Sequence, residues 1–219
     1  TSFCTTPKAS TLIVFAIMFG WTLLWGLPNA ADRMNRGPVL VLNENIGHYF
    51  VGNYMELYED EQGTLTLEDV MSERYRPLFY RVNKESPSFG FTESVYWVRV
   101  RIRNPYDIAL KRFVEFDYPA FDHIELYKPV NGSYEKEVTG DRYPYTKREM
   151  DYRTFIFEID LPPQAEQEYY MRLSSSSMNI ILHLWTVDAL IEKIDFEQTV
   201  RSLFLGAIFI TIIFNLVLY

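Results

Sequence analysis

The sequence has few of the residues on which catalytic and metal sites usually depend. Cys4 is the one cysteine in 219 residues, which excludes an internal disulfide and leaves no usable catalytic cysteine. The three histidines, His48, His123 and His183, are far apart and lack the spacing of metal ligands. Neither a nucleophile elbow nor a phosphate-binding loop occurs. We therefore expect no metal, no cofactor and no enzymatic activity in this chain.

The chain also has fewer basic than acidic residues. It contains 21 Lys and Arg and 29 Asp and Glu, so its net charge is −8. An acidic protein repels phosphate backbones, so nucleic acid is not an expected partner. It is also a poor match for an anionic lipid surface. The hydrophobic content of 48% and aromatic content of 16% are enough for a folded core.

Charge is almost absent at the two ends of the chain. At the N-terminus, Lys8 precedes an apolar stretch, the breaker Pro28 and small residues, which is typical of a cleaved secretory signal. An uncleaved apolar helix is the alternative, and both predict export of the central part of the chain. The C-terminal segment is apolar on every side, which predicts a transmembrane helix. It has no basic flank, so we expect a truncated chain that naturally continues.

The interior shows the period-two alternation of half-buried β-strands. In Tyr96–Arg103, one face holds Tyr96 and three aliphatic residues, and the other holds Trp97 and three arginines. The alternation recurs in residues 113–118, 123–127, 154–161, 169–173 and 180–185.

Turn-forming dipeptides separate these runs. Asn131-Gly132 predicts a tight hairpin because both residues tolerate positive φ. Short strands with no long helix between them predict an all-β fold, an antiparallel sandwich or barrel. Residues 67–72 predict a short helical turn. The expected organisation is a signal peptide or apolar helix, a β-sandwich domain, a helical or irregular connector and a transmembrane helix, over residues 1–31, 32–190, 191–201 and 202–219.

The second face of Tyr96–Arg103 is the first candidate ligand site. Trp97 could stack on a sugar ring while Arg99 and Arg101 donate bidentate hydrogen bonds to an anionic ligand. The alternative is that Trp97 caps the sandwich edge and the arginines pair with acids on a neighbouring strand, Glu115 and Asp117.

Two further candidates are weaker. Glu115 and Asp117 lie on one strand face about 7 Å apart, a spacing open to a glycosidase, although ion pairing is the favoured interpretation. The tyrosine-rich loop 142–152, with Tyr145 and Arg148, suits a recognition surface, and a packed loop is its alternative.

Six stretches, in order, resemble one known family, the bacterial seven-transmembrane receptors with diverse intracellular signalling modules. The resemblance is to their second type of extracellular domain and first membrane helix, over roughly residues 40–219. The stretches are GTLTLEDVMS, FGFTESVYWVRVRIRNP, EFDYPAFDHIELY, TGDRYPYTKREMDYRTFIFEIDLPP, EYYMRLSSSSMNIILHLW and LFLGAIFITIIFNLVLY.

The resemblance implies a jelly-roll sandwich similar to carbohydrate-binding modules, on the outer side of the bacterial inner membrane. It implies that a carbohydrate or another small molecule is sensed and that a transmembrane bundle passes the signal to a cytoplasmic module, such as a diguanylate cyclase or a histidine kinase. Six helices and that module are missing from this chain. We expect a homodimer, and the sequence itself does not determine the oligomeric state. The alternatives are a membrane-tethered glycan-active enzyme and a structural envelope protein.

The family's motif positions correspond to Trp97, Asn104, Pro105, Gly140, Asp141, Arg148 and Asn215. We expect Gly140 to occupy a turn with positive φ and Asp141 to pair with Arg148. Asn215 lies in an apolar helix and needs a polar partner, which we expect from another helix of the bundle.

Overall fold

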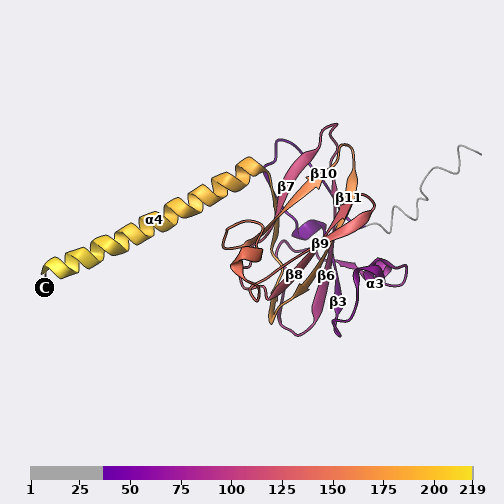
Figure 1. Cartoon of the computed structure of the whole chain (residues 1–219), viewed down its shortest axis with the longest axis horizontal. Coiled ribbons are helices and arrows are strands. Elements are labelled where there is room, and N and C mark those ends of the chain that lie inside the picture. Colours follow the sequence, from indigo (N-terminus) through magenta and orange to yellow (C-terminus); the bar gives the residue numbers. More distant parts are fainter. Residues whose placement is uncertain (1–36, 219) are drawn as a thin grey trace, which may run out of the picture. The chain divides into compact units, whose positions relative to one another are not determined.

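The computed structural model describes residues 37–218, so the predicted signal segment, residues 1–31, lies outside the described residues. Two β-sheets pack face to face, which confirms the all-β sandwich of antiparallel sheets (Figure 1). A separate ribbon has two strands. The parallel pairing of β1 (Val39–Val41) with β6 (Val95–Arg103) is an exception. The jelly-roll connectivity stays a prediction.

The larger sheet has the order β4-β3-β6-β11-β8-β9, and β1 joins it beside β6. Its other strands are β3 (Met55–Asp60), β4 (Tyr80–Arg81), β8 (His123–Val130), β9 (Ser133–Thr139) and β11 (Glu166–Ser174). The smaller sheet has the order β10-β7-β13-β2. Its strands are β2 (His48–Phe50), β7 (Leu110–Phe116), β10 (Phe155–Leu161) and β13 (Leu182–Trp185).

The remaining elements are short, apart from the last helix. The ribbon pairs β5 (Ser88–Phe91) with β12 (Ser177–Asn179). The others are η1 (Gly52–Tyr54), α3 (Leu67–Met71), η2 (Arg76–Leu78), η3 (Tyr145–Lys147) and α4 (Val187–Leu218). The predicted helical turn at 67–72 is therefore confirmed as α3. A capping box between Thr66 and Asp69 satisfies its first backbone N–H groups.

The main core lies between the two sheets and is built from one face of each alternating strand. On β6 this face is Tyr96, Val98, Val100 and Ile102, as the alternation predicts. The smaller sheet contributes Val114, Phe116, Phe157, Ile159, Leu182 and Leu184. Each fully buried side chain of this size contributes about 1.5–3 kcal/mol to folding.

The outward face of β6 is covered as well. Trp97 has no exposed surface and packs with Leu67 and Val70 of α3, with Phe79 and with Tyr170 of β11. A second, smaller core therefore lies on the outside of the larger sheet. Period-two alternation predicts which residues share a face, but it does not reveal that a second layer covers the outer one.

Two turns match their predicted chemistry. The β8–β9 hairpin turns through Asn131 and Gly132, at φ 50° and 80°. Gly140 has φ 149°, and a Cβ there would lie 2.3 Å from the carbonyl oxygen of Asp122. Only glycine fits this position without moving the backbone.

Asn104 braces the loop that it begins with Pro105. Its side chain is fully buried, and its Oδ1 accepts a hydrogen bond from the backbone N–H of Tyr106 at 3.0 Å. Its Nδ2 donates to the carbonyl oxygens of Ile108, Leu161 and Pro162. The Asn-Pro motif of this chain therefore has an architectural role.

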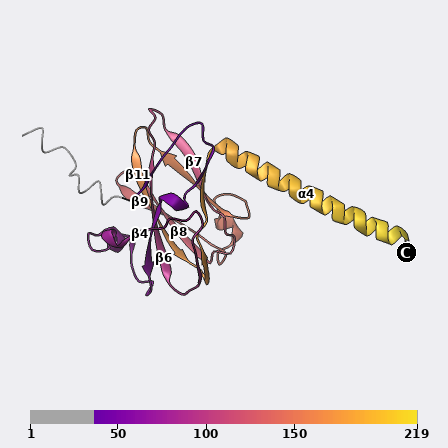
Figure 2. The same cartoon turned by 180° about the vertical axis from the view of Figure 1, so that it is seen from behind.

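Helix α4 is continuous, so the predicted connector at 191–201 is helical and joins the apolar segment without a break (Figure 2). Within residues 37–218, α4 is the one helix that is long and apolar enough to cross a membrane. All its residues from 198 to 218 are exposed. Asn215 Nδ2 donates to the carbonyl oxygen of Thr211 at 2.7 Å. This bond satisfies one amide donor inside the helix and leaves the predicted bundle contact as a prediction.

Candidate functional site

The two arginines of the predicted ligand face are held in ion pairs inside the larger sheet. Arg99 is 5% exposed; its Nη2 lies 2.9 Å from Glu56 Oε2, and its guanidinium lies 4.6 Å from the centre of the Phe79 ring. Arg101 is 6% exposed and donates to the carbonyl oxygen of Gly37, with Glu166 Oε1 at 3.6 Å from its Nη1. Neither guanidinium presents its full hydrogen-bonding edge to solvent.

The predicted pairing of these arginines with Glu115 and Asp117 is wrong. Glu115 belongs to β7, which lies in the smaller sheet, whereas Arg99 and Arg101 belong to β6 in the larger one. The acids that face the arginines come from β3 and β11, which flank β6. Alternation alone does not tell which strands become neighbours, so it points to the wrong acids.

Trp97 lies beneath an open groove instead of forming its surface. Its indole stacks on the ring of Tyr127, with centroids 5.8 Å apart and planes at 25°. Across the strands, Trp97 is opposite Arg172 of β11, and Arg172 is opposite Glu125 of β8. The strand register therefore places Trp97, Arg172 and Glu125 side by side on the outer face of the larger sheet, and the Tyr127 ring stacks on the indole.

This outer groove has a volume of about 660 Å³, within the range of small-molecule sites. Three elements form it: the segment leading into α3, the β8–β9 hairpin and β11. The lining includes Thr64, Glu68, Glu125, Tyr127, Tyr134, Lys136 and Arg172.

Glu125 is the most strongly held charge in the outer groove. Its Oε1 lies 2.9 Å from His123 Nε2, and its Oε2 accepts a hydrogen bond from the Tyr127 hydroxyl. Lys136 Nζ and Arg172 Nη1 lie 3.7 and 3.8 Å from Oε1. The hydrogen bond from His123 is the main cause that lowers the pKa of Glu125 to about 2. Near neutral pH Glu125 is therefore an ionised acceptor and does not act as a general acid.

The other polar groups of the groove complement this acceptor. Arg172 Nη2 donates to the carbonyl oxygen of Gly63 at 2.9 Å, which fixes its planar fork at the rim. Burial raises the pKa of Tyr134 to about 12 and raises the pKa of Tyr127 as well. Both phenols stay protonated, so the groove combines two carboxylates, two cations and two hydroxyls around aromatic rings.

The predicted recognition loop is a braced loop. Arg148 Nη1 donates to the carbonyl oxygens of Tyr152 and Arg153, and its guanidinium lies 4.4 Å from the centre of the Tyr145 ring. The backbone N–H of Asp141 donates a hydrogen bond to the carbonyl oxygen of Phe121. In the part of the chain that the structure describes, the expected Asp141–Arg148 ion pair is not formed. Tyr145 is half exposed and does not line the outer groove.

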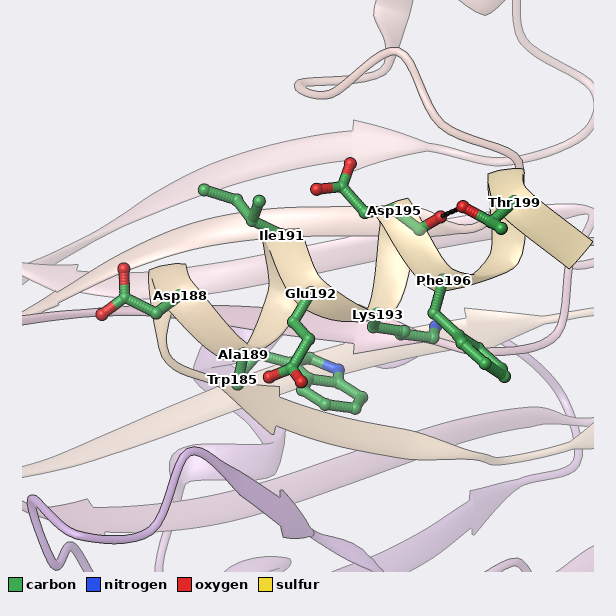
Figure 3. Close-up of a pocket in the computed structure, with 9 residues that line it drawn as sticks. All are labelled: Trp185, Asp188, Ala189, Ile191, Glu192, Lys193, Asp195, Phe196 and Thr199. Carbon is green, nitrogen blue, oxygen red and sulfur yellow. Dashed lines mark hydrogen bonds between the residues drawn. The ribbon is translucent and has the colours of Figure 1, made fainter.

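A second polar site, which sequence reasoning missed, joins the smaller sheet to α4. Glu115 has no exposed surface. Its carboxylate accepts hydrogen bonds from Thr154 Oγ1 at 2.7 Å, from Trp185 Nε1 at 2.8 Å and from Lys193 Nζ. Figure 3 shows Trp185 and Lys193 on the sandwich side of α4. A Glu115 side chain sealed in this way does not reach a polysaccharide, which argues against the glycosidase interpretation.

Further contacts extend this helix joint, by which we mean Glu115, Lys193 and the polar side chains packed around them. Glu197 of α4 accepts hydrogen bonds from the Tyr152 hydroxyl and from Arg153 Nε. On the sandwich side, His48 Nε2 lies 2.9 Å from His183 Nδ1. Glu115 and Lys193 are 78 positions apart, and no local pattern in the sequence links the two residues.

Comparison with known proteins identifies the family. The family model described as 7TMR-DISM extracellular 2 matches residues 52–186, from η1 to the residue before α4. No curated protein matches the chain. The matched region contains the outer groove and the sandwich side of the helix joint, apart from His48. Together with the apolar helix, it places the sandwich outside a membrane as a receptor domain. This chain belongs to the 7TMR-DISM extracellular 2 family.

Proposed function

We propose that this chain is the ligand-sensing part of a bacterial inner-membrane receptor and that the outer groove binds a small polar ligand, most simply a carbohydrate. The observation that carries the proposal is the open groove of about 660 Å³ on a receptor's extracellular domain. Its charged and hydroxyl groups are already positioned by bonds within the protein, so a ligand needs little rearrangement of the site.

The chemistry of the groove favours a ligand rich in hydroxyl groups. Glu125 and Arg172 offer an acceptor and planar donors close together, and Tyr127 and Tyr134 offer ring surface with hydroxyl groups. The two acids of the lining, Glu68 and Glu125, balance its two bases, Lys136 and Arg172, which favours a neutral ligand over a strongly anionic one. Trp97 supports Tyr127 from below and is therefore a positioning residue.

Occupancy of the groove is proposed to be passed through α4 to a transmembrane bundle and a cytoplasmic signalling module, with a homodimer as the working unit. The family supports a receptor of this type. Asn215 supports a bundle, because its carboxamide has two donors and an acceptor and one donor is used within α4.

Thermal unfolding of the full chain in lipid nanodiscs, with a library of neutral mono- and oligosaccharides, tests the ligand proposal. A saturating ligand at 100 times its Kd stabilises the folded state by about 2.7 kcal/mol. The variants Tyr134→Ala and Arg172→Met should abolish the shift in Tm. The matched control is Tyr80→Ala, which removes an exposed tyrosine of the same sheet that does not line the groove.

Two results would overturn this assignment. One is a saturable ligand whose shift in Tm persists in both groove variants. The other is release of sugar products from an added polysaccharide, which would favour the glycan-active enzyme.

A further inference from the structure

The helix joint holds two of the three histidines of the chain in direct contact. His48 Nε2 and His183 Nδ1 are 2.9 Å apart, and His183 Nε2 lies 3.7 Å from Asp117 Oδ2. The His48 ring also stacks on Trp185, with centroids 3.9 Å apart. A hydrogen bond between two imidazoles needs one nitrogen to donate and the other to accept, so it exists only while at least one ring is neutral.

Burial opposes protonation of this pair. Burial is the main cause that lowers the pKa of both His48 and His183; Lys193 lowers it further and Glu115 opposes it. Both rings are therefore neutral at pH 7 and take up protons only below about pH 6.5. The other titratable or charged groups of the joint are Asp117 after β7, Glu197 of α4, and Tyr152 and Arg153 before β10.

Few contacts hold the first turns of α4 on the sandwich. Leu190 is the buried residue of α4 and packs with Phe113 and Ile156. The polar contacts of α4 are those of Lys193 with Glu115 and of Glu197 with the loop before β10. Within residues 37–218, Lys193 is therefore the one lysine that attaches α4 to β7, and it does so by donating a hydrogen bond to Glu115. His183 is the cross-strand neighbour of Glu115. A cation on the His183 ring would weaken that attachment, because it competes with Lys193 for the same carboxylate.

We propose that the helix joint is an acid-responsive switch, in which protonation of the His48–His183 pair releases the first turns of α4 from the smaller sheet. The first proton creates an imidazolium that competes with the Lys193 ammonium for Glu115. The second proton removes the imidazole–imidazole hydrogen bond and places two cations in contact. The protons come from solvent, and no covalent bond changes apart from the new N–H bonds. The proposal goes beyond ligand sensing and does not depend on the outer groove being occupied.

Hydrogen exchange of the full chain in nanodiscs, without added ligand, tests the switch. Between pH 7.5 and 5.5, after correction for intrinsic exchange rates, we expect the protection of amides 188–197 to fall about tenfold or more. The protection of β6 and β11 should stay unchanged, because His48 and His183 lie on the smaller sheet. Unchanged protection of 188–197 down to pH 5 would overturn the proposal.

The matched variants separate the histidine pair from general acid effects. His48→Gln and His183→Asn together keep an amide donor and acceptor in place of the two bonded nitrogens but take up no proton. This double variant should lose the pH dependence. His123→Asn, the third histidine, should keep it. The same pH dependence in the double variant would contradict the switch.

Should the double variant fail to fold, an NMR titration of the histidine rings of the wild-type chain decides the question. Two of the three rings must then titrate over the pH range in which 188–197 lose protection. If both joint histidines stay neutral while protection falls, the proposal is wrong.

Discussion

Each outer face of the sandwich holds a partly or fully buried glutamate carboxylate, and these two carboxylates have different kinds of hydrogen-bond partner. Glu125 on β8 is bonded by His123 and Tyr127, each two positions away along the chain. Glu115 on β7 is bonded by Thr154, Trp185 and Lys193, which come from distant parts of the sequence. The first carboxylate lines an open groove, whereas α4 seals the second.

The difference shows how surroundings divide two similar carboxylates between two tasks. A charge satisfied by its own strand leaves the surface above it free for a ligand. A charge satisfied by a separate helix binds that helix to the sheet, because separating them would leave a buried ion without a partner. We therefore expect damage at the groove and damage at the joint to be separable.

Removing the aromatic support under the groove should have the largest effect. Trp97→Ala deletes a fully buried indole from the second core, and such truncations cost about 3–5 kcal/mol. Chemical unfolding of the variant should show this loss, while hydrogen exchange at 188–197 keeps its wild-type protection. Trp97→Phe is the control and should lose much less. Loosening of α4 in Trp97→Ala would mean that the two faces are not separable.

Breaking the helix joint should have the second-largest effect on stability. Lys193→Met leaves Glu115 buried without its cation, which we expect to cost about 3 kcal/mol at the joint. Adding Glu115→Gln removes the stranded charge, keeps an acceptor for Trp185 and lets the amide donate to the Thr154 hydroxyl, so the double variant should recover most of the loss. A double-mutant cycle on unfolding free energies measures this recovery. Additive effects of the two substitutions would show that the pair is not coupled.

The two outer faces should lose stability in different pH ranges as the pH is lowered. The folded-state pKa of Glu125 is lowered from 4.5 to about 2, so its stabilising effect is complete above pH 4.5 and is lost between pH 4.5 and 2. The pKa values of His48 and His183 are lowered from 6.5. In the window below pH 6.5 the unfolded chain binds more protons, so stability falls as the pH drops.

Unfolding free energies measured from pH 8 to 2 should therefore fall in two steps. Glu125→Gln should flatten the lower step, which solvent screening in the open groove limits to about 2 kcal/mol. The double histidine variant should flatten the upper one. A single step that neither variant alters would remove the contrast between the faces.

Much of the sandwich can be predicted from the sequence, because the face of a strand is a local property. The alternation of Tyr96–Arg103, the Asn131-Gly132 hairpin and the positive φ of Gly140 all appear in the structure. Strand order is not local. Arg99 pairs with Glu56, 43 positions away, and nothing in the periodicity of β6 points to β3. For the same reason the aromatic surface of the groove belongs to Tyr127, while Trp97 lies below it.

The smallest expected effect lies inside the groove. Tyr127→Phe removes one hydroxyl bond to Glu125 and keeps the ring that stacks on Trp97, so unfolding should cost only about 1 kcal/mol. Because Glu125 then loses one of the bonds that favour its ionised form, its pKa should rise, and the lower acid step should move to higher pH. Tyr134→Phe is the matched control, since its hydroxyl binds the carbonyl oxygen of Glu168 instead. An equal movement of the acid step in both variants would show that the groove responds to any lost hydroxyl and that Tyr127 has no special hold on Glu125.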